Sequence, residues 1–300
     1  MSAPAKQLGI VVAVDGSPAS DAAVVWAARD AALQSIPLTL FHAVVTPTTT
    51  WPPVPYPDSL LVKLEDDCRK ELAHALKLAE DAMPADHKVP IKKEFVYSTP
   101  ALALSKMSDD AEMIVVGSSG RGLLARGLLG SVSSSVVSHA NCPVAVIRDE
   151  DLPNPQHGPV LVGIDGSPAS ELATEIAFDQ ASRRGVELIA LHAWSDVPLS
   201  ELPDLSWAAV EDEAERRLAE SVAGWHERYP NVTVRRLLVR DLPAHQLVQQ
   251  SKSREAQLVV VGSHGRGGLT GLILGSVSNA VLHSVRIPVI VARPPQGTAH

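Results

Sequence analysis

A chain of 300 residues is long enough for two globular domains. Its residues are 45% apolar and 20% charged, the composition of a folded protein rather than of a disordered one. A formal net charge of −8, together with the lack of any run of Lys and Arg, excludes nucleic acid as the main partner.

Short apolar runs alternate with amphipathic segments along the first half of the chain. A helix is expected to begin at Ser17-Pro18, because Ser is a good N-cap and Pro suits the first helical position. Ser59–Met83 has the charge and spacing of a long amphipathic helix. The runs with the length and β-branched content of buried strands are Leu8–Val14, Leu38–Val44, Lys92–Val96, Met113–Val116 and Val144–Ile147.

The second half of the chain repeats the first. Ile10–Val44 matches Val160–Trp194, and Ala111–Arg148 matches Ala256–Arg293. An internal repeat of this length indicates a duplicated domain. The polar, Pro-rich stretch Asp149–Pro159 lies between the two copies and is typical of a linker. We therefore predict domain 1 at residues 1–148, a linker at 149–158 and domain 2 at 159–300.

The second copy carries the same signals for its own elements. Ser167-Pro168 predicts a helix start, Ser206–Tyr229 a long amphipathic helix and Val232–Val239 a strand. Strands that alternate with helices imply parallel crossovers, so each domain is expected to be a doubly wound α/β fold with a five-stranded parallel sheet. Such sheets bind ligands at the carboxyl ends of their strands, where the strand order reverses.

Chemically distinctive residues follow the predicted strands at that end of each sheet. Asp15 and Asp165 end the first strand of each copy, and His42 and His192 end the second. A glycine-rich loop follows the fourth strand, as Gly117-Ser-Ser-Gly120-Arg-Gly in the first copy. The second copy has the loop Gly262-Ser-His-Gly265-Arg-Gly, and the segments Gly130-Ser131-Val132-Ser133 and Gly275-Ser276-Val277-Ser278 follow the two loops.

The glycine loops have the chemistry of an anion site. Gly117 and Gly120 would permit positive φ and a close approach of the backbone to a sugar or phosphate. Gly130-Ser131 would open a helix whose N-terminal N–H groups face an anion, and Ser131 and Ser133 would add hydroxyl donors. Neither loop contains the Lys of a Walker P-loop, and the glycines do not follow the first strand as in a dinucleotide fold. We expect Gly117→Ala with Gly262→Ala to reduce nucleotide binding and to leave the fold intact.

These residues resemble the nucleotide signature of the universal stress protein family, in its ATP-binding branch. That signature is a Gly, two residues, a Gly, nine residues, and then Gly-Ser or Gly-Thr. Gly117, Gly120 and Gly130-Ser131 fit it, as do their counterparts in the second copy. The similarity covers nearly the whole chain apart from the linker and the termini. The two-copy layout is similar to that of tandem family members from mycobacteria.

The resemblance implies a role for each part of the site. Asp15 and Asp165 would lie near the ribose or a phosphate-bound Mg²⁺, and the backbone of Ala43 and Ala193 would contact the adenine edge. It also implies that fifth strands pair, here within one chain; we infer that the two loop arginines clamp phosphate. The residues expected to bind nucleotide are Ala13, Asp15, Ala43, Gly117, Ser118, Ser119, Gly120, Arg121, Gly122, Gly130, Ser131, Val132 and Ser133 in the first copy, and Gly163, Asp165, Ala193, Gly262, Ser263, His264, Gly265, Arg266, Gly267, Gly275, Ser276, Val277 and Ser278 in the second.

Each feature also has a simpler structural explanation. An Asp between a strand and a helix often forms an Asx-turn, and a Ser before a helix is a cap before it is a nucleophile. His42 and His192 are more often packing or hydrogen-bonding residues than catalytic ones. The Pro-rich stretch Thr46–Asp58 and its counterpart Ser195–Leu205 are either surface connections or a lid or partner surface that carries Trp51, Tyr56 and Trp207.

The sequence favours an ATP-binding regulator or sensor over an enzyme, since no catalytic residue and no metal-ligand cluster stands out. The alternatives are a slow ATP hydrolase or nucleotidyl-transfer enzyme, and an interaction module that binds no nucleotide. The expected partners are an adenine nucleotide and either a second copy, in a homodimer, or a signalling protein; neither nucleic acid nor a membrane is expected. Two widely spaced cysteines and the lack of a signal peptide predict a cytoplasmic protein.

Overall fold

A computed structural model describes residues 7–45, 58–120, 129–149, 157–193, 207–265 and 274–294. The chain divides into two compact units, Met1–Asp149 and Glu150–His300, which are described separately. Most of the predicted linker and of the two Pro-rich stretches lies outside the described residues. In the part of the chain that is described, no helix has the length and the apolar character needed to cross a membrane.

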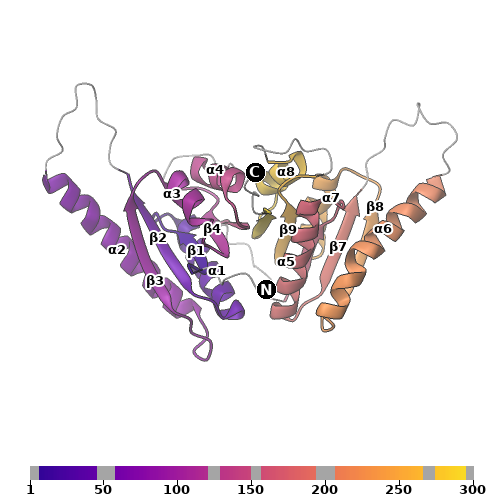
Figure 1. Ribbon diagram of the computed structural model, residues 1–300, viewed down its shortest axis with the longest axis horizontal. Helices are drawn as coiled ribbons and strands as arrows, with labels where there is room; N and C mark the ends of the chain where they lie inside the picture. Colours follow the sequence, from indigo (N-terminus) through magenta and orange to yellow (C-terminus); the bar gives the residue numbers. More distant parts are fainter. Residues whose placement is uncertain are drawn as a thin grey trace, which may run out of the picture. The chain divides into compact units, whose positions relative to one another are not determined.

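The first unit is a five-stranded parallel sheet with two helices on each face. Its strand order is β3-β2-β1-β4-β5. Helices α1 and α2 pack together on one face, and α3 and α4 pack together on the other (Figure 1). The elements are β1 (Ile10–Ala13), α1 (Pro18–Gln34), β2 (Leu38–Val44), α2 (Asp58–Ala82), β3 (Ile91–Tyr97), α3 (Pro100–Met107), β4 (Met113–Gly117), α4 (Ser131–His139) and β5 (Val144–Ile147).

The second unit repeats this arrangement in the order β10-β9-β6-β7-β8, again with all strands parallel. Helices α5 and α6 cover one face, and α7 and α8 pack together on the other (Figure 1). The α/β fold with two doubly wound sheets is thus confirmed. The elements are β6 (Val160–Gly163), α5 (Pro168–Arg184), β7 (Leu188–Ala193), α6 (Trp207–Arg228), β8 (Val234–Val239), α7 (Pro243–Ser253), β9 (Leu258–Gly262), α8 (Ser276–Ser284) and β10 (Val289–Ala292).

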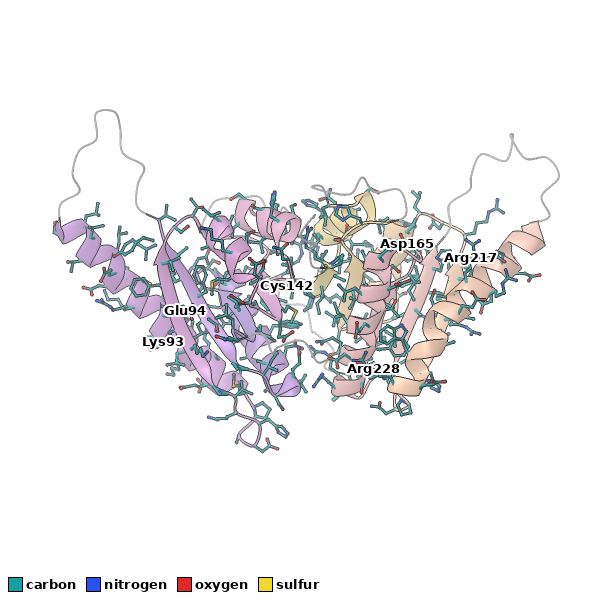
Figure 2. The ribbon with its side chains drawn as sticks, viewed as in Figure 1. Lys93, Glu94, Cys142, Asp165, Arg217 and Arg228 are labelled. Atoms are coloured by element: carbon teal, nitrogen blue, oxygen red, sulfur yellow. The ribbon has the colours of Figure 1, made fainter. Side chains whose placement is uncertain are left out.

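Small and branched side chains fill both cores, as expected for a protein with few aromatic residues. Ala23, Ala27 and Ala31 on α1 are fully buried against the sheet, and the central strands β1 and β4 are buried along most of their length. Alanine lets the helix approach the sheet closely. The outer strands β3 and β8 are instead charged, through Lys93 and Glu94 on β3 for example (Figure 2). Charged side chains protect such edges from pairing with other chains.

The helix that follows the first strand begins at a capped N-terminus in both units. Ser17 is extended (φ −83°, ψ 156°), and its Oγ accepts a hydrogen bond from Ser20 N at 3.2 Å. Ser167 does the same for Ser170 N, also at 3.2 Å. Pro18 and Pro168 occupy the first helical position, where no N–H is needed. Both predicted helix starts are confirmed.

Replacing Ser17 by alanine should therefore lower the free energy of unfolding of the first unit by about 1 kcal/mol, since the cap is lost. Ser17→Thr keeps the hydroxyl oxygen and is the matched control. Urea unfolding of the two variants checks the prediction. Equal stability of the alanine and threonine variants would show that the cap contributes nothing.

Candidate functional site

Each unit has a cavity at the carboxyl ends of its central strands, where the strand order reverses. The cavity of the first unit measures about 290 Å³ and that of the second about 370 Å³. Every predicted site residue that the structure describes lines one of them, except Ser118 and Ser263. Arg121, Gly122, Arg266 and Gly267 lie outside the described residues.

The aspartates after β1 and β6 present one carboxylate oxygen to the cavity. Asp15 Oδ1 accepts hydrogen bonds from Ser17 N at 3.0 Å and from Ser17 Oγ at 2.6 Å, which is the geometry of an Asx-turn. Asp165 Oδ1 is bound in the same way by Ser167, at 2.9 and 2.7 Å. The turn therefore holds the carboxylate in place. Oδ2 of each aspartate faces the glycine loop opposite, so the structural explanation and a role in binding are compatible.

Gly120 and Gly265 are the glycines that face these carboxylates. A Cβ at Gly120 would lie 2.7 Å from Asp15 Oδ2, and one at Gly265 would lie 2.5 Å from Asp165 Oδ2. Among the residues that the structure describes, no other side chain or backbone crowds either position closely. A side chain here would fill the space beside the carboxylate, which supports the predicted reason for a glycine at these two positions.

Gly117 and Gly262 serve the core, and the predicted role of these two glycines is wrong in its physical reason. A Cβ at Gly117 would lie 2.8 Å from the carbonyl carbon of Ala19 and 2.9 Å from its oxygen. One at Gly262 would lie 2.9 Å from the carbonyl carbon of Ala169. These glycines let the first turn of α1 or α5 pack on β4 or β9. Of the loop glycines that the structure describes, Gly117, Gly120, Gly262 and Gly265, none has a positive φ, so the expected left-handed backbone is absent at these positions.

The Ser118 carbonyl and the Ser133 hydroxyl are hydrogen-bonded to each other within the protein. The Ser118 carbonyl accepts hydrogen bonds from Gly130 N at 2.7 Å and from Ser133 Oγ at 3.1 Å. Ser133 Oγ also lies 3.1 Å from the Gly130 carbonyl. Ser263 and Ser278 repeat this arrangement. Because a hydroxyl has one proton, Ser133 and Ser278 do not have the free donor that the sequence suggested. They fix the loop against the helix.

Backbone N–H groups supply further donors at this end of the cavity. Gly130 is the N-cap of α4, and no side chain caps the helix. The first helical hydrogen bond runs from Ser134 N to Gly130 O at 2.9 Å. The N–H groups of Ser131, Val132 and Ser133 precede it and belong to the uncapped first turn, where the helix dipole attracts an anion. Gly275 caps α8 in the same way.

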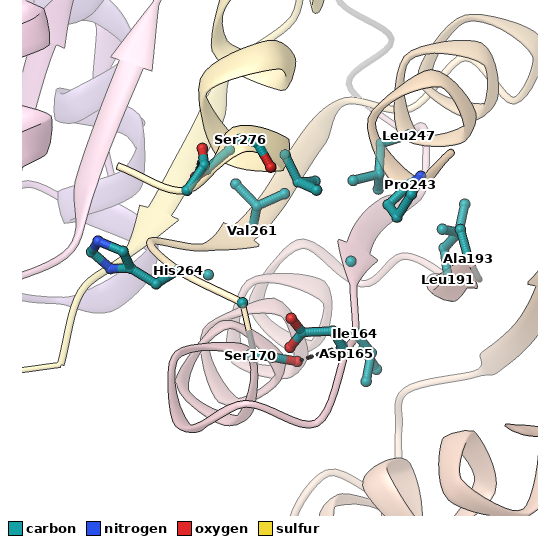
Figure 3. A pocket seen from close by; sticks show the side chains of 16 residues that line it. Ile164, Asp165, Ser170, Leu191, Ala193, Pro243, Leu247, Val261, His264 and Ser276 are labelled. Atoms are coloured by element: carbon teal, nitrogen blue, oxygen red, sulfur yellow. Dashed lines mark hydrogen bonds between the residues drawn. The ribbon is translucent and has the colours of Figure 1, made fainter. Parts of the chain in front are cut away.

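The opposite end of each cavity is apolar and is formed in part by a helix, α3 or α7, that was not predicted from the sequence. Pro100 and Leu104 of α3 line the first cavity, and Pro243 and Leu247 of α7 line the second. Figure 3 shows Pro243, Leu247 and Val261 across the cavity from Asp165 and Ser170. The signal was available, because Pro100 and Pro243 mark helix starts as Pro18 does.

The histidines near the cavities have structural partners. His42 Nδ1 lies 2.8 Å from the Val14 carbonyl and 3.3 Å from Glu71 Oε2, and His192 Nδ1 lies 2.6 Å from the Ile164 carbonyl. Both histidines are therefore hydrogen-bonded to the backbone, in line with the structural role expected for them. His264 occupies the loop position of Ser119; burial first, and then the charge of Arg293, lower its pKa and favour the neutral ring.

Comparisons with known proteins agree with the duplicated fold. The model of the Universal stress protein family matches residues 9–148 and 157–293. A universal stress protein of Mycobacterium tuberculosis is 63% identical over 295 residues, which cover 98% of this chain and 99% of that protein. One of Mycolicibacterium smegmatis is 46% identical, with coverages of 97% and 98%. The crystal structure of a universal stress protein from Archaeoglobus fulgidus covers 97% of this chain and 98% of its own, with a TM-score of 0.71 at 20% identity.

Proposed function

The chain belongs to the universal stress protein family, and on that premise we propose that it binds ATP in each of its two cavities and acts as a nucleotide-dependent regulator. The observation that carries the proposal is one arrangement built twice. Each cavity has an aspartate whose Oδ1 is held by a serine and whose Oδ2 is left uncovered by a glycine. It also has an uncapped helix N-terminus and an apolar wall. A packing accident would not be expected to keep all four in both units.

The chemistry of each cavity suits the parts of an adenine nucleotide. The apolar wall at Leu104 or Leu247 is suited to the flat adenine ring, and the free carboxylate oxygen of Asp15 or Asp165 can accept a hydrogen bond from a ribose hydroxyl or lie near a phosphate-bound Mg²⁺. The backbone N–H groups at the start of α4 or α8 would hold phosphate oxygens. The cavities are close to the lower end of the usual range for small-molecule sites, roughly 300–1,000 Å³.

A regulatory role needs only binding, because a ligand stabilises the state that binds it. At a concentration of one hundred times Kd, a ligand stabilises that state by about 2.7 kcal/mol. In this proposal the protein works in the cytoplasm and passes the signal to a signalling protein or a second copy. Cys68 and Cys142 are both buried and form no disulfide, which suits a reducing compartment.

Mass spectrometry of the denatured, freshly purified protein tests the proposal most directly. We expect it to release ATP, and we expect calorimetry of the stripped protein with ATP and Mg²⁺ to give a stoichiometry of two. The proposal would be refuted if the purified protein released no adenylate and the stripped protein gave no binding heat at millimolar ATP. Single-turnover assays with labelled ATP separate the regulator from the alternative enzyme. Retention of intact ATP supports the regulator, and turnover that is lost in Asp15→Ala with Asp165→Ala would identify a slow hydrolase.

A further inference from the structure

The two cavities differ at four of their aligned lining positions. Twelve of the sixteen aligned pairs that line both cavities have the same residue type in the two units, and the phosphate-end glycines are among them. Despite this, the second cavity is the larger, at about 370 Å³ against about 290 Å³. The pairs that differ are Ala13 and Gly163, Val14 and Ile164, Phe41 and Leu191, and Ser119 and His264.

Two of these differences remove bulk from the apolar end of the second cavity. Ala13, the last residue of β1, is the register partner of Phe41 in the middle of β2. Gly163 and Leu191 are the equivalent partners on β6 and β7, and both side chains are smaller. The other two differences add bulk in the second unit and so do not account for its larger cavity. In Figure 3 the imidazole of His264 points away from Asp165 and Leu247.

Position 163 acts on the apolar wall through Leu247. A Cβ at Gly163 would lie 3.1 Å from Leu247 Cδ1 and 3.7 Å from Val261 Cγ1, closer to the leucine than ordinary packing allows. With glycine there, Leu247 packs closer to the strand than a Cβ would allow. In the first unit Ala13 carries that Cβ, and Leu104 on α3 is the leucine that lines the cavity at the equivalent position.

We propose that the residue at position 13 or 163 decides which substituted adenine bases its cavity accepts. With Gly163, the second cavity accepts adenine nucleotides that carry an apolar substituent on the base. With Ala13, the first cavity excludes them. This inference rests on the proposed function, and it makes the two sites unequal. The substituent must be apolar because Leu191, Pro243, Leu247 and Val261 form that end of the cavity. An uncompensated polar group there would be costly.

Single-site variants allow each cavity to be tested alone in the full chain. Gly265→Val is expected to weaken ATP binding at the second site by about 5- to 150-fold, so that the first site is measured as the tighter one, and Gly120→Val should do the reverse, since each Cβ meets an aspartate oxygen. Calorimetry then compares ATP with N6-benzyl-ATP and 2-methylthio-ATP, in the presence of Mg²⁺. In the Gly265→Val protein at least one analogue should bind about 5- to 150-fold more weakly than ATP, the range expected for overpacking. In the Gly120→Val protein the same analogue should bind nearly as well as ATP.

Exchanging the natural residues gives the decisive comparison. Gly163→Ala in the Gly120→Val protein should weaken binding of the analogue more than binding of ATP, and Ala13→Gly in the Gly265→Val protein should strengthen binding of the analogue relative to ATP. Gly224→Ala on α6, where a Cβ meets no atom within 4 Å, is the control for the glycine-to-alanine change. The same preference in both cavities, or exchanges without effect, would overturn this inference and leave the proposed function standing. If neither cavity binds ATP, the proposed function itself fails.

Discussion

Alanine at Gly117 or Gly262 is expected to destabilise its unit by about 1–3 kcal/mol, the usual cost of overpacking a core. The added Cβ meets the backbone of Ala19 or Ala169, at 2.8–2.9 Å from the carbonyl carbon. Backbone in the first turn of a capped helix cannot move away as a flexible side chain can. The helix must therefore shift on the sheet, and the Asx-turn at Asp15 or Asp165 must shift with it.

Urea unfolding of Gly117→Ala and Gly262→Ala measures this cost. Gly224→Ala is the control, and should be neutral or stabilising by up to about 1 kcal/mol because its site is open and helical. Loss of nucleotide binding with an unchanged unfolding free energy would restore the expectation from the sequence that these glycines serve the ligand alone.

Valine at both Gly120 and Gly265 is expected to weaken ATP binding by about 5- to 150-fold at each site, and to leave the fold intact. Both glycines are exposed, and the nearest atom to an added Cβ is the aspartate Oδ2 that faces the cavity. Oδ1 of each aspartate is held by a serine, so the carboxylate cannot turn away without losing that contact.

Thermal unfolding with and without ATP and Mg²⁺ separates the two effects. The double variant should unfold at the temperature of the parent protein when no nucleotide is present, and it should lose the shift that ATP produces. Ser131→Ala is a useful comparison, since its backbone N–H remains; the proposed site should tolerate it far better. Normal ATP affinity in the double variant would remove the glycine loops from the site.

The elements of this fold were accessible from the sequence because they depend on local signals. Leu38–Val44 and Val144–Ile147 are strands with the predicted bounds, and helices α1 and α5 start at the predicted caps, Ser17 and Ser167. β1 is shorter than predicted, since Leu8 N bonds to the Asp110 carbonyl instead of a neighbouring strand. Because the domain is duplicated, the helix starts and strand patterns of the first unit recur in the second.

The sequence by itself determined the duplicated α/β fold and placed an aspartate and a glycine loop at one end of each sheet, because periodicity, caps and repeats are properties of neighbouring residues. Only the tertiary structure showed that Gly117 faces α1 while Gly120 faces Asp15, and that Leu104 closes the cavity. Residues brought together from separate strands and helices decide those contacts. The spacing of glycines in the sequence does not show which residue a side chain at each glycine position would contact.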